Sequence, residues 1–128
     1  MCLILDTTVL IDAAKHREPA LSWLRDALEQ SIELGVCGVI VAEFYAGLRP
    51  DERSRWEAFI DELTYWGTTR EMAQQAGIYR YDFARRGRAI LTPDAMIAAT
   101  AVAVGAALVT DNVKDFPMPE LEIIRLQP

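Results

Sequence analysis

The chain alternates short apolar runs with longer segments of mixed polarity. Continuous apolar runs at residues 2–5 (CLIL), 36–41 (VCGVIV) and 106–110 (AALVT) are typical of strands buried on both faces. Two shorter strands are predicted around residues 63–67 and 121–126. The regular return of such runs along the chain is the first indication of its fold class.

Between these runs, apolar residues three and four positions apart predict helices. The predicted helices cover residues 7–15, 19–34, a segment beginning at 42, 51–63, 70–86 and 92–104. Thr7 or Thr8 is available to cap the first helix, and Gly35 is expected to end the second. Thr69 and Thr92 are expected to cap the last two helices, and Gly105 to end the final one. The final helix is apolar on all sides, so it should be central.

Strands that alternate with helices imply right-handed crossovers and a mostly parallel sheet covered on both faces. The predicted fold is therefore a three-layer α/β/α domain. The 128 residues, with 52% hydrophobic and 25% charged content, contain no linker-like tract, so one domain spanning residues 1–128 is expected. In such a sheet, ligands bind beyond the carboxyl ends of the strands.

Acidic residues follow the ends of the predicted strands. Asp6 comes directly after the first strand, Glu43 lies in the opening turn of the helix after the second, and Asp94 opens the last helix. The run at 106–110 is followed by Asp111, Asn112 and Asp115. Two carboxylates 4 Å apart repel by about 4 kcal/mol at an effective dielectric of 20. Such groups either raise one another's pKa or hold a cation, and oxygen-only ligands favour Mg²⁺ or Mn²⁺ over zinc.

Each acid also has a purely structural explanation. Asp94 and Glu43 could complement a helix dipole, and Asp115 and Asn112 could cap a turn. Asp6 is harder to explain in this way, because a carboxylate directly after a buried strand needs a partner. The joint placement of the acids is what favours a metal site.

Composition narrows the partners and the location. The formal net charge of −6 disfavours a broad basic surface for nucleic acid, although a bound cation adds charge that a residue count omits. The longest uncharged apolar run, residues 95–109, is shorter than the roughly 20 residues of a membrane-spanning helix, and no signal-peptide pattern is present. A cytoplasmic location without membrane association is expected. The only histidine, His16, lies in a polar segment and does not suggest a catalytic base.

Three stretches resemble the PIN domain, and specifically the VapC toxins of bacterial and archaeal toxin–antitoxin pairs. They are LILDTTVLID, AEFYAGL and PDAMIAATAVAVGAALVTDNVKDF. The resemblance implies a PIN-like fold and identifies Asp6, Glu43 and Asp94 with three metal-binding acids of the family. The family places its fourth acid at the position of Asn112 or of Asp115, and this chain has an acid only at Asp115.

Other polar residues would support these four. Thr8 stands where the family usually has asparagine, and its hydroxyl can still bond a ligand or water. Thr110 matches a polar position beside the site. Asn112 is a supporting candidate because it stands at one of the family's two positions for the fourth acid. Asp111 is secondary, because many relatives carry a basic residue at its position.

The family's activity implies endonucleolytic hydrolysis of RNA with Mg²⁺ or Mn²⁺ as cofactor, the four acids serving as both metal-binding and catalytic groups. It also implies a VapB-type antitoxin as partner, and a homodimer or a larger toxin–antitoxin assembly. A cluster of arginines could either contact RNA phosphates or simply complement a helix end. The cluster comprises Arg80, Arg85, Arg86 and Arg88.

Two other classes of function fit this sequence less well. The first is a catalytically silent PIN-like module that binds a basic protein partner through its acidic pocket; the near-complete acid set argues against it. The second is another Mg²⁺-dependent phosphoryl-transfer protein, such as a receiver or a haloacid-type phosphatase. A phosphatase of that type needs D-x-D at the first strand, and this chain has Thr8 in place of the second aspartate.

Overall fold

A parallel sheet forms the centre of the computed structural model, which describes residues 2–127. The described residues form five strands in the order β3-β2-β1-β4-β5, and each neighbouring pair is parallel. The strands are β1 (Cys2–Leu5), β2 (Glu33–Cys37), β3 (Thr64–Trp66), β4 (Ala107–Val109) and β5 (Ile123–Ile124). β1 is in the middle of the sheet, so the residue that follows its carboxyl end lies between the carboxyl ends of β2 and β4.

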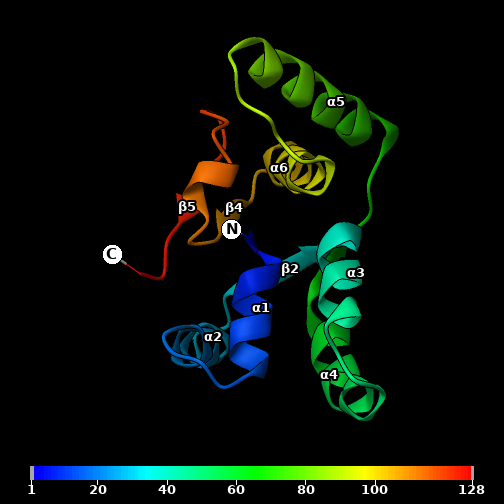
Figure 1. Cartoon of the computed structure of the whole chain (residues 1–128). Coiled ribbons are helices and arrows are strands. Elements are labelled where there is room, and N and C mark those ends of the chain that lie inside the picture. Colours follow the sequence, from blue (N-terminus) through cyan, green and yellow to red (C-terminus); the bar gives the residue numbers. More distant parts are fainter. Residues whose placement is uncertain (1, 128) are drawn as a thin grey trace.

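Helices cover both faces of this sheet, as Figure 1 shows with α5 and α6 above it and α1 and α2 below it. The helices are α1 (Thr7–Ala14), α2 (Ala20–Glu29), α3 (Gly38–Ala46), α4 (Pro50–Glu62), α5 (Arg70–Arg85) and α6 (Thr92–Val104). A short 3₁₀ turn, η1 (Val113–Asp115), follows β4. The three-layer α/β/α prediction is confirmed. No helix within residues 2–127 has the length and apolarity needed to cross a membrane.

Helix α6 is central, as predicted, and small residues make this possible. Four of its alanines are almost completely buried: Ala95, Ala98, Ala99 and Ala101. Alanine side chains allow a helix to lie close to its neighbours, because little volume separates the backbones. The buried hydroxyl of Thr100 donates to the carbonyl of Met96 at 2.8 Å, so this polar group is satisfied within the helix.

The second strand and third helix begin earlier than the sequence predicted. Gly35 lies inside β2 and does not end α2, which stops at Glu29. A side chain at Gly35 would start 3.0 Å from Cys2 Sγ, so the glycine allows close packing inside the sheet. Helix α3 starts at Gly38, within the predicted strand 36–41, because a short apolar run fits a buried helix as well as a buried strand. Glu43 therefore lies in the second turn of α3, not in its opening turn.

Helix capping agrees with the sequence at some ends and differs at others. Thr69 caps α5 through its side chain, and Gly105 ends α6 with a φ of 70°, both as predicted. Neither candidate threonine caps α1, because the Asp6 carboxylate occupies that position and aspartate is a stronger capping residue than threonine. Thr92 is the first residue of α6 and does not cap it.

Candidate metal centre

Asp6 forms the buried floor of the site. It directly follows β1 and is only 5% exposed. Its Oδ1 accepts a hydrogen bond from the Thr7 backbone N–H at 2.8 Å, and its Oδ2 accepts one from the Thr110 hydroxyl at 2.7 Å. Burial raises the pKa of Asp6, while these hydrogen bonds oppose the rise by stabilising the charged form. Both oxygens of the carboxylate therefore have fixed directions.

Thr110 connects the end of β4 to the end of β1. The two strands pair in parallel with Leu5 opposite Val109, so the residues that follow them leave the sheet side by side. Thr110 is completely buried, and its hydroxyl oxygen accepts from the Asn112 backbone N–H at 3.0 Å while it donates to Asp6. The loop that leads to Asp115 therefore starts from a fixed point beside Asp6.

Glu43 reaches the site from α3. Its residue is exposed, and its Oε1 accepts a hydrogen bond from the Thr7 hydroxyl at 2.8 Å. Because α1 and α3 pack against each other, the second turn of α3 comes close to the first turn of α1. Thr7 therefore contacts both Asp6, through its backbone, and Glu43, through its side chain.

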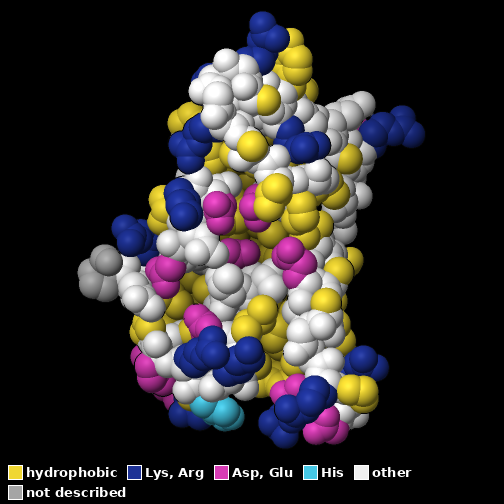
Figure 2. All heavy atoms as spheres, in the orientation of Figure 1, with side chains coloured by type: hydrophobic (Ala, Val, Ile, Leu, Met, Phe, Trp, Pro, Cys, Tyr) yellow, Lys and Arg dark blue, Asp and Glu magenta, His cyan; other side chains and the backbone are white. Residues whose placement is uncertain are grey.

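The electrostatics of Asp94 show that the four acids share one neighbourhood. Asp94 is half-buried in the first turn of α6, and its pKa is raised to about 6. Burial is the main cause, followed by the negative charges of Asp115, Asp6 and Glu43. Figure 2 shows acidic side chains gathered in a hollow between α6 and the pair α1 and α3. Four distant chain segments thus bring carboxylates close enough for the charges of three of them to act on Asp94.

The chemistry of this pocket fits a hard divalent cation, because its donors are carboxylate oxygens and their mutual repulsion is what a cation relieves. The described side chains nevertheless do not form a closed ligand cage: within residues 2–127, no three His, Cys, Asp or Glu side chains are arranged to hold an ion. Asp6 is directed by Thr7 and Thr110, and Glu43 by Thr7. Asp94 and Asp115 are half-buried, and the charge of Asp115 acts on Asp94.

The supporting residues predicted from the sequence lie in different places. Thr110 contacts Asp6 directly. Thr8 is exposed, and its hydroxyl lowers the pKa of Asp6 less than Thr110 and the Thr7 backbone do. Asn112 contributes its backbone N–H, and its residue is exposed. Asp111 is engaged elsewhere: its Oδ1 accepts from the backbone N–H groups of Leu126 at 2.8 Å and Gln127 at 3.0 Å.

Thr7 is the residue of this site that the sequence analysis considered only as a cap. A usable signal was present, because Thr7, Leu10 and Ile11 have the i, i+3, i+4 spacing of one helix face. That face packs inward, whereas Thr8 is turned to solvent. Helical periodicity would therefore have selected Thr7 as the threonine that faces the interior.

The arginines of the predicted basic cluster make contacts within the fold. Arg80 donates to the carbonyl of Ile90 at 2.9 Å, and Arg88 donates to the carbonyl of Lys114 at 2.6 Å. The other two lie over aromatic rings, Arg85 over Tyr81 and Arg86 over Phe83, each 5.2 Å from the ring centroid. These contacts are not to the carbonyls at the end of α5, and all four arginines are exposed.

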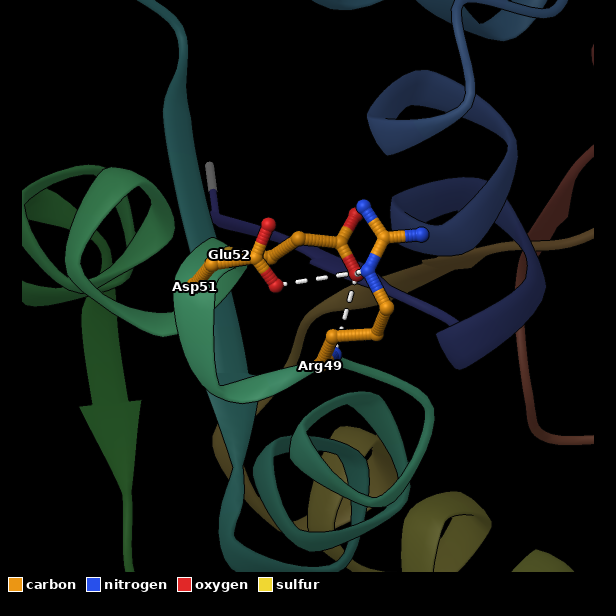
Figure 3. Close-up of polar contacts among 3 residues, drawn as sticks. All are labelled: Arg49, Asp51 and Glu52. Carbon is orange, nitrogen blue, oxygen red and sulfur yellow. Dashed lines mark hydrogen bonds and ion pairs between the residues drawn. The ribbon is translucent and has the colours of Figure 1, made fainter.

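A groove of about 600 Å³ lies beside the site, on the helices that carry Glu43 and follow Asp6. Its apolar lining comes from Ile11, Ala14, Phe44 and Leu48. Its polar lining comes from Lys15, His16, Arg49, Glu52 and Arg55. In Figure 3, the Arg49 side chain extends toward the carboxylates of Asp51 and Glu52, with Nε 3.3 Å and 3.8 Å from them. These ion pairs are exposed and contribute little stability, so the rim can rearrange.

Comparisons with known proteins identify the family of this fold. The family model described as "PIN domain" matches residues 3–117. The chain is 31% identical over 120 residues to Ribonuclease VapC19 of Mycobacterium tuberculosis. This match covers 93% of this chain and 96% of that protein.

Solved structures of toxin–antitoxin complexes have the same fold. VapBC2 from Rickettsia felis, bound to a DNA fragment from its promoter, matches with a TM-score of 0.83 and 25% identity over 98% of both chains. DNA-bound VapBC from Salmonella typhimurium matches with a TM-score of 0.82 and 26% identity over 98% of both chains. On the family match over residues 3–117 and the similarity that spans nearly the whole chain, this protein belongs to the PIN-domain family, in its VapC group.

Proposed function

We propose that this protein is a metal-dependent endoribonuclease, the toxin of a type II toxin–antitoxin pair that acts in the cytoplasm. The observation that carries the proposal is the grouping of four acids, Asp6, Glu43, Asp94 and Asp115, around the oriented carboxylate of Asp6. Burial, together with the charges of the other three acids, raises the pKa of Asp94 to about 6. A divalent cation that neutralises this cluster of carboxylates stabilises the protein, because it relieves their mutual repulsion. The relative from Mycobacterium tuberculosis is named a ribonuclease, which supports RNA as the substrate.

Each acid has a distinct role in this proposal. Asp6 and Asp94 hold Mg²⁺ or Mn²⁺, and Glu43 and Asp115 complete the shell or orient the attacking water. When bound, the cation would supply Lewis-acid polarisation of the phosphodiester and lower the pKa of the water. Asp6 is suited to a direct ligand because both its oxygens are oriented by hydrogen bonds and its burial limits competition from water. No histidine base is required, and His16 lies on the neighbouring groove.

The proposal is tested by incubating the purified protein, freed of any partner, with a structured RNA pool in Mg²⁺, in Mn²⁺ or in chelator. Cleavage is expected with either metal and not with chelator. Asp6→Asn should abolish cleavage while the thermal midpoint stays close to that of the wild type. Asp26→Asn, on the exposed surface of α2, is the matched control for the loss of one carboxylate. Cleavage that persists in chelator contradicts the metal-dependent mechanism.

We also propose a VapB-type antitoxin as partner, with the groove on α1, α3 and α4 as its seat. An apolar lining with basic groups at the rim suits an amphipathic segment that carries acidic residues. The similar structures named above are VapBC complexes, which supports such a partner. The chain itself is proposed to form a homodimer within this assembly.

One observation favours a second candidate, a catalytically silent module that captures a basic partner in the acidic pocket. Within the described residues, no three acids are arranged as metal ligands. The same RNA assay separates the two candidates, because only the nuclease cleaves RNA in Mn²⁺. Binding of a basic antitoxin tail without cleavage of any RNA in the pool would favour the silent module.

A further inference from the structure

One residue connects two of the four acids. The Thr7 backbone N–H donates to Asp6 Oδ1 at 2.8 Å, and the Thr7 hydroxyl donates to Glu43 Oε1 at 2.8 Å. Thr7 is buried, so its bond to Asp6 is shielded from water, and its bond to the exposed Glu43 is partly shielded. The two carboxylates come from segments 37 positions apart, and Thr7 alone contacts both through the hydrogen bonds described in residues 2–127.

Glu43 depends on this contact more than Asp6 does. Asp6 is buried and has a second hydrogen bond from Thr110, whereas Glu43 is exposed on α3. Among the described residues, the bond from Thr7 is the one side-chain hydrogen bond made by Glu43. A free glutamate side chain samples many rotamers, so a single anchored oxygen decides where its second oxygen points.

Threonine is well suited to this task. Its branched β-carbon leaves few rotamers in a helix, so the hydroxyl direction is restricted before any ligand arrives. The neighbouring Thr8 is exposed and has no described hydrogen bond to Glu43. The inward-facing threonine of the DTT sequence is therefore the one in contact with an acid from another helix.

We propose that Thr7 is a positioning residue of the metal centre: its hydroxyl holds Glu43 so that the remaining oxygen faces the pocket shared with Asp6 and Asp94. This inference rests on the proposed nuclease function and adds a residue that acts through Glu43 without touching substrate. Groups that orient metal ligands in this way commonly change metal affinity by about 10- to 100-fold when they are removed.

The test compares Thr7→Val, which keeps the shape and removes the hydroxyl, with Thr7→Ser, which keeps the hydroxyl. Mn²⁺ affinity is measured by calorimetry, and kcat and KM are measured on one cleaved RNA. Thr7→Val should weaken Mn²⁺ binding about 10- to 100-fold and lower kcat with little change in KM. Thr7→Ser should restore both values. Thr100→Val is the matched control, because it removes a buried hydroxyl that bonds only to a carbonyl within α6.

A double-mutant cycle with Glu43→Gln distinguishes positioning from a general structural effect. If Thr7 acts through Glu43, adding Thr7→Val to Glu43→Gln should weaken Mn²⁺ binding much less than it does in the wild type. Equal effects in both backgrounds, or wild-type Mn²⁺ affinity in Thr7→Val, would overturn the inference. A wild-type protein that binds no Mn²⁺ would instead overturn the proposed function. Crystal structures of wild type and Thr7→Val then decide the inference by themselves, because an unmoved Glu43 carboxylate overturns it.

Discussion

The hydroxyl of Thr110 donates a 2.7 Å hydrogen bond to Oδ2 of Asp6, across 104 positions of sequence. Both groups are buried, and they follow adjacent parallel strands. The bond therefore fixes the carboxylate on which the site is built, and it also joins the first and fourth strands at the edge of the sheet where the acids lie.

Removing this donor should cost stability as well as activity. Thr110→Val leaves Asp6 Oδ2 without its partner in a buried setting, which is expected to lower the free energy of unfolding by about 1–3 kcal/mol. Urea unfolding at pH 7.5 measures the loss. Thr110→Ser, which retains the hydroxyl, should recover most of it. Equal destabilisation by serine and valine would show that the methyl group, and not the hydrogen bond, is responsible.

The pKa of Asp94 predicts a pH dependence of stability in metal-free buffer. Because the folded pKa is raised from the ordinary 3.8 to about 6, the folded protein binds this proton more tightly than the unfolded chain does. The stabilising contribution is complete below about pH 4 and is lost as the pH rises through 6. Asp94→Asn lacks the ionisation and should be more stable than wild type at pH 7.5, by about 1–2 kcal/mol after allowance for partial solvent exposure.

Urea unfolding of the two proteins between pH 4 and 8 in chelator checks this prediction. The difference between Asp94→Asn and wild type should grow with pH and level off above pH 6. Saturating Mn²⁺ at pH 7.5 should reverse the order, because the ion stabilises only the protein that binds it. A difference that is constant with pH would contradict a raised carboxyl pKa at Asp94.

Replacing Asp111 should loosen the C-terminal segment more than it weakens metal binding. Its carboxylate accepts hydrogen bonds from the backbone N–H groups of Leu126 and Gln127, so Asp111→Ala leaves both donors without their acceptor. Hydrogen exchange at the Leu126 amide should accelerate, and the free energy of unfolding should fall by about 1 kcal/mol. Mn²⁺ affinity measured on the same variant shows whether Asp111 also supports the site. Unchanged exchange at Leu126 would contradict the anchoring role.

The groove predicts a separation between partner binding and folding. Ala14→Arg places a long cationic side chain in the apolar lining of the groove and should weaken binding of the antitoxin at least about tenfold, or about 1.4 kcal/mol. Binding is measured by calorimetry with the purified antitoxin. Ala73→Arg, on the exposed surface of α5, is the matched control. Equal affinities of the two variants would place the antitoxin elsewhere on the protein.

The sequence predicted the elements whose ends carry specific signals. Thr69 caps a helix because its hydroxyl accepts a backbone N–H, and Gly105 ends one because glycine, without a Cβ, adopts the left-handed conformation, so both were predicted correctly. The run from Val36 to Val41 was read incorrectly at its boundary. Its residues are apolar whether the segment is a buried strand or a buried helix, so only packing against β1 and α1 decides.

The site was predicted to the level of its acids and not of their partners. Asp6 was identified because a carboxylate after a buried strand is costly without a partner, and the structure supplies Thr110 as one. Thr7 was assigned only as a possible cap. The bond from Thr7 to Glu43 depends on how α1 and α3 pack, and this information is not contained in the local sequence of either helix.

The buried alanines of α6 extend the sensitive region of the protein well beyond its carboxylates. Ala98 lies one helical turn after Asp94 and is completely enclosed, so a bulkier residue there would push the whole helix outward and carry Asp94 with it. In cells poisoned by this protein, escape mutants should therefore include valine or threonine replacements of these buried alanines together with changes to the acids themselves. A variant inactivated in this way would retain every acidic residue of the site.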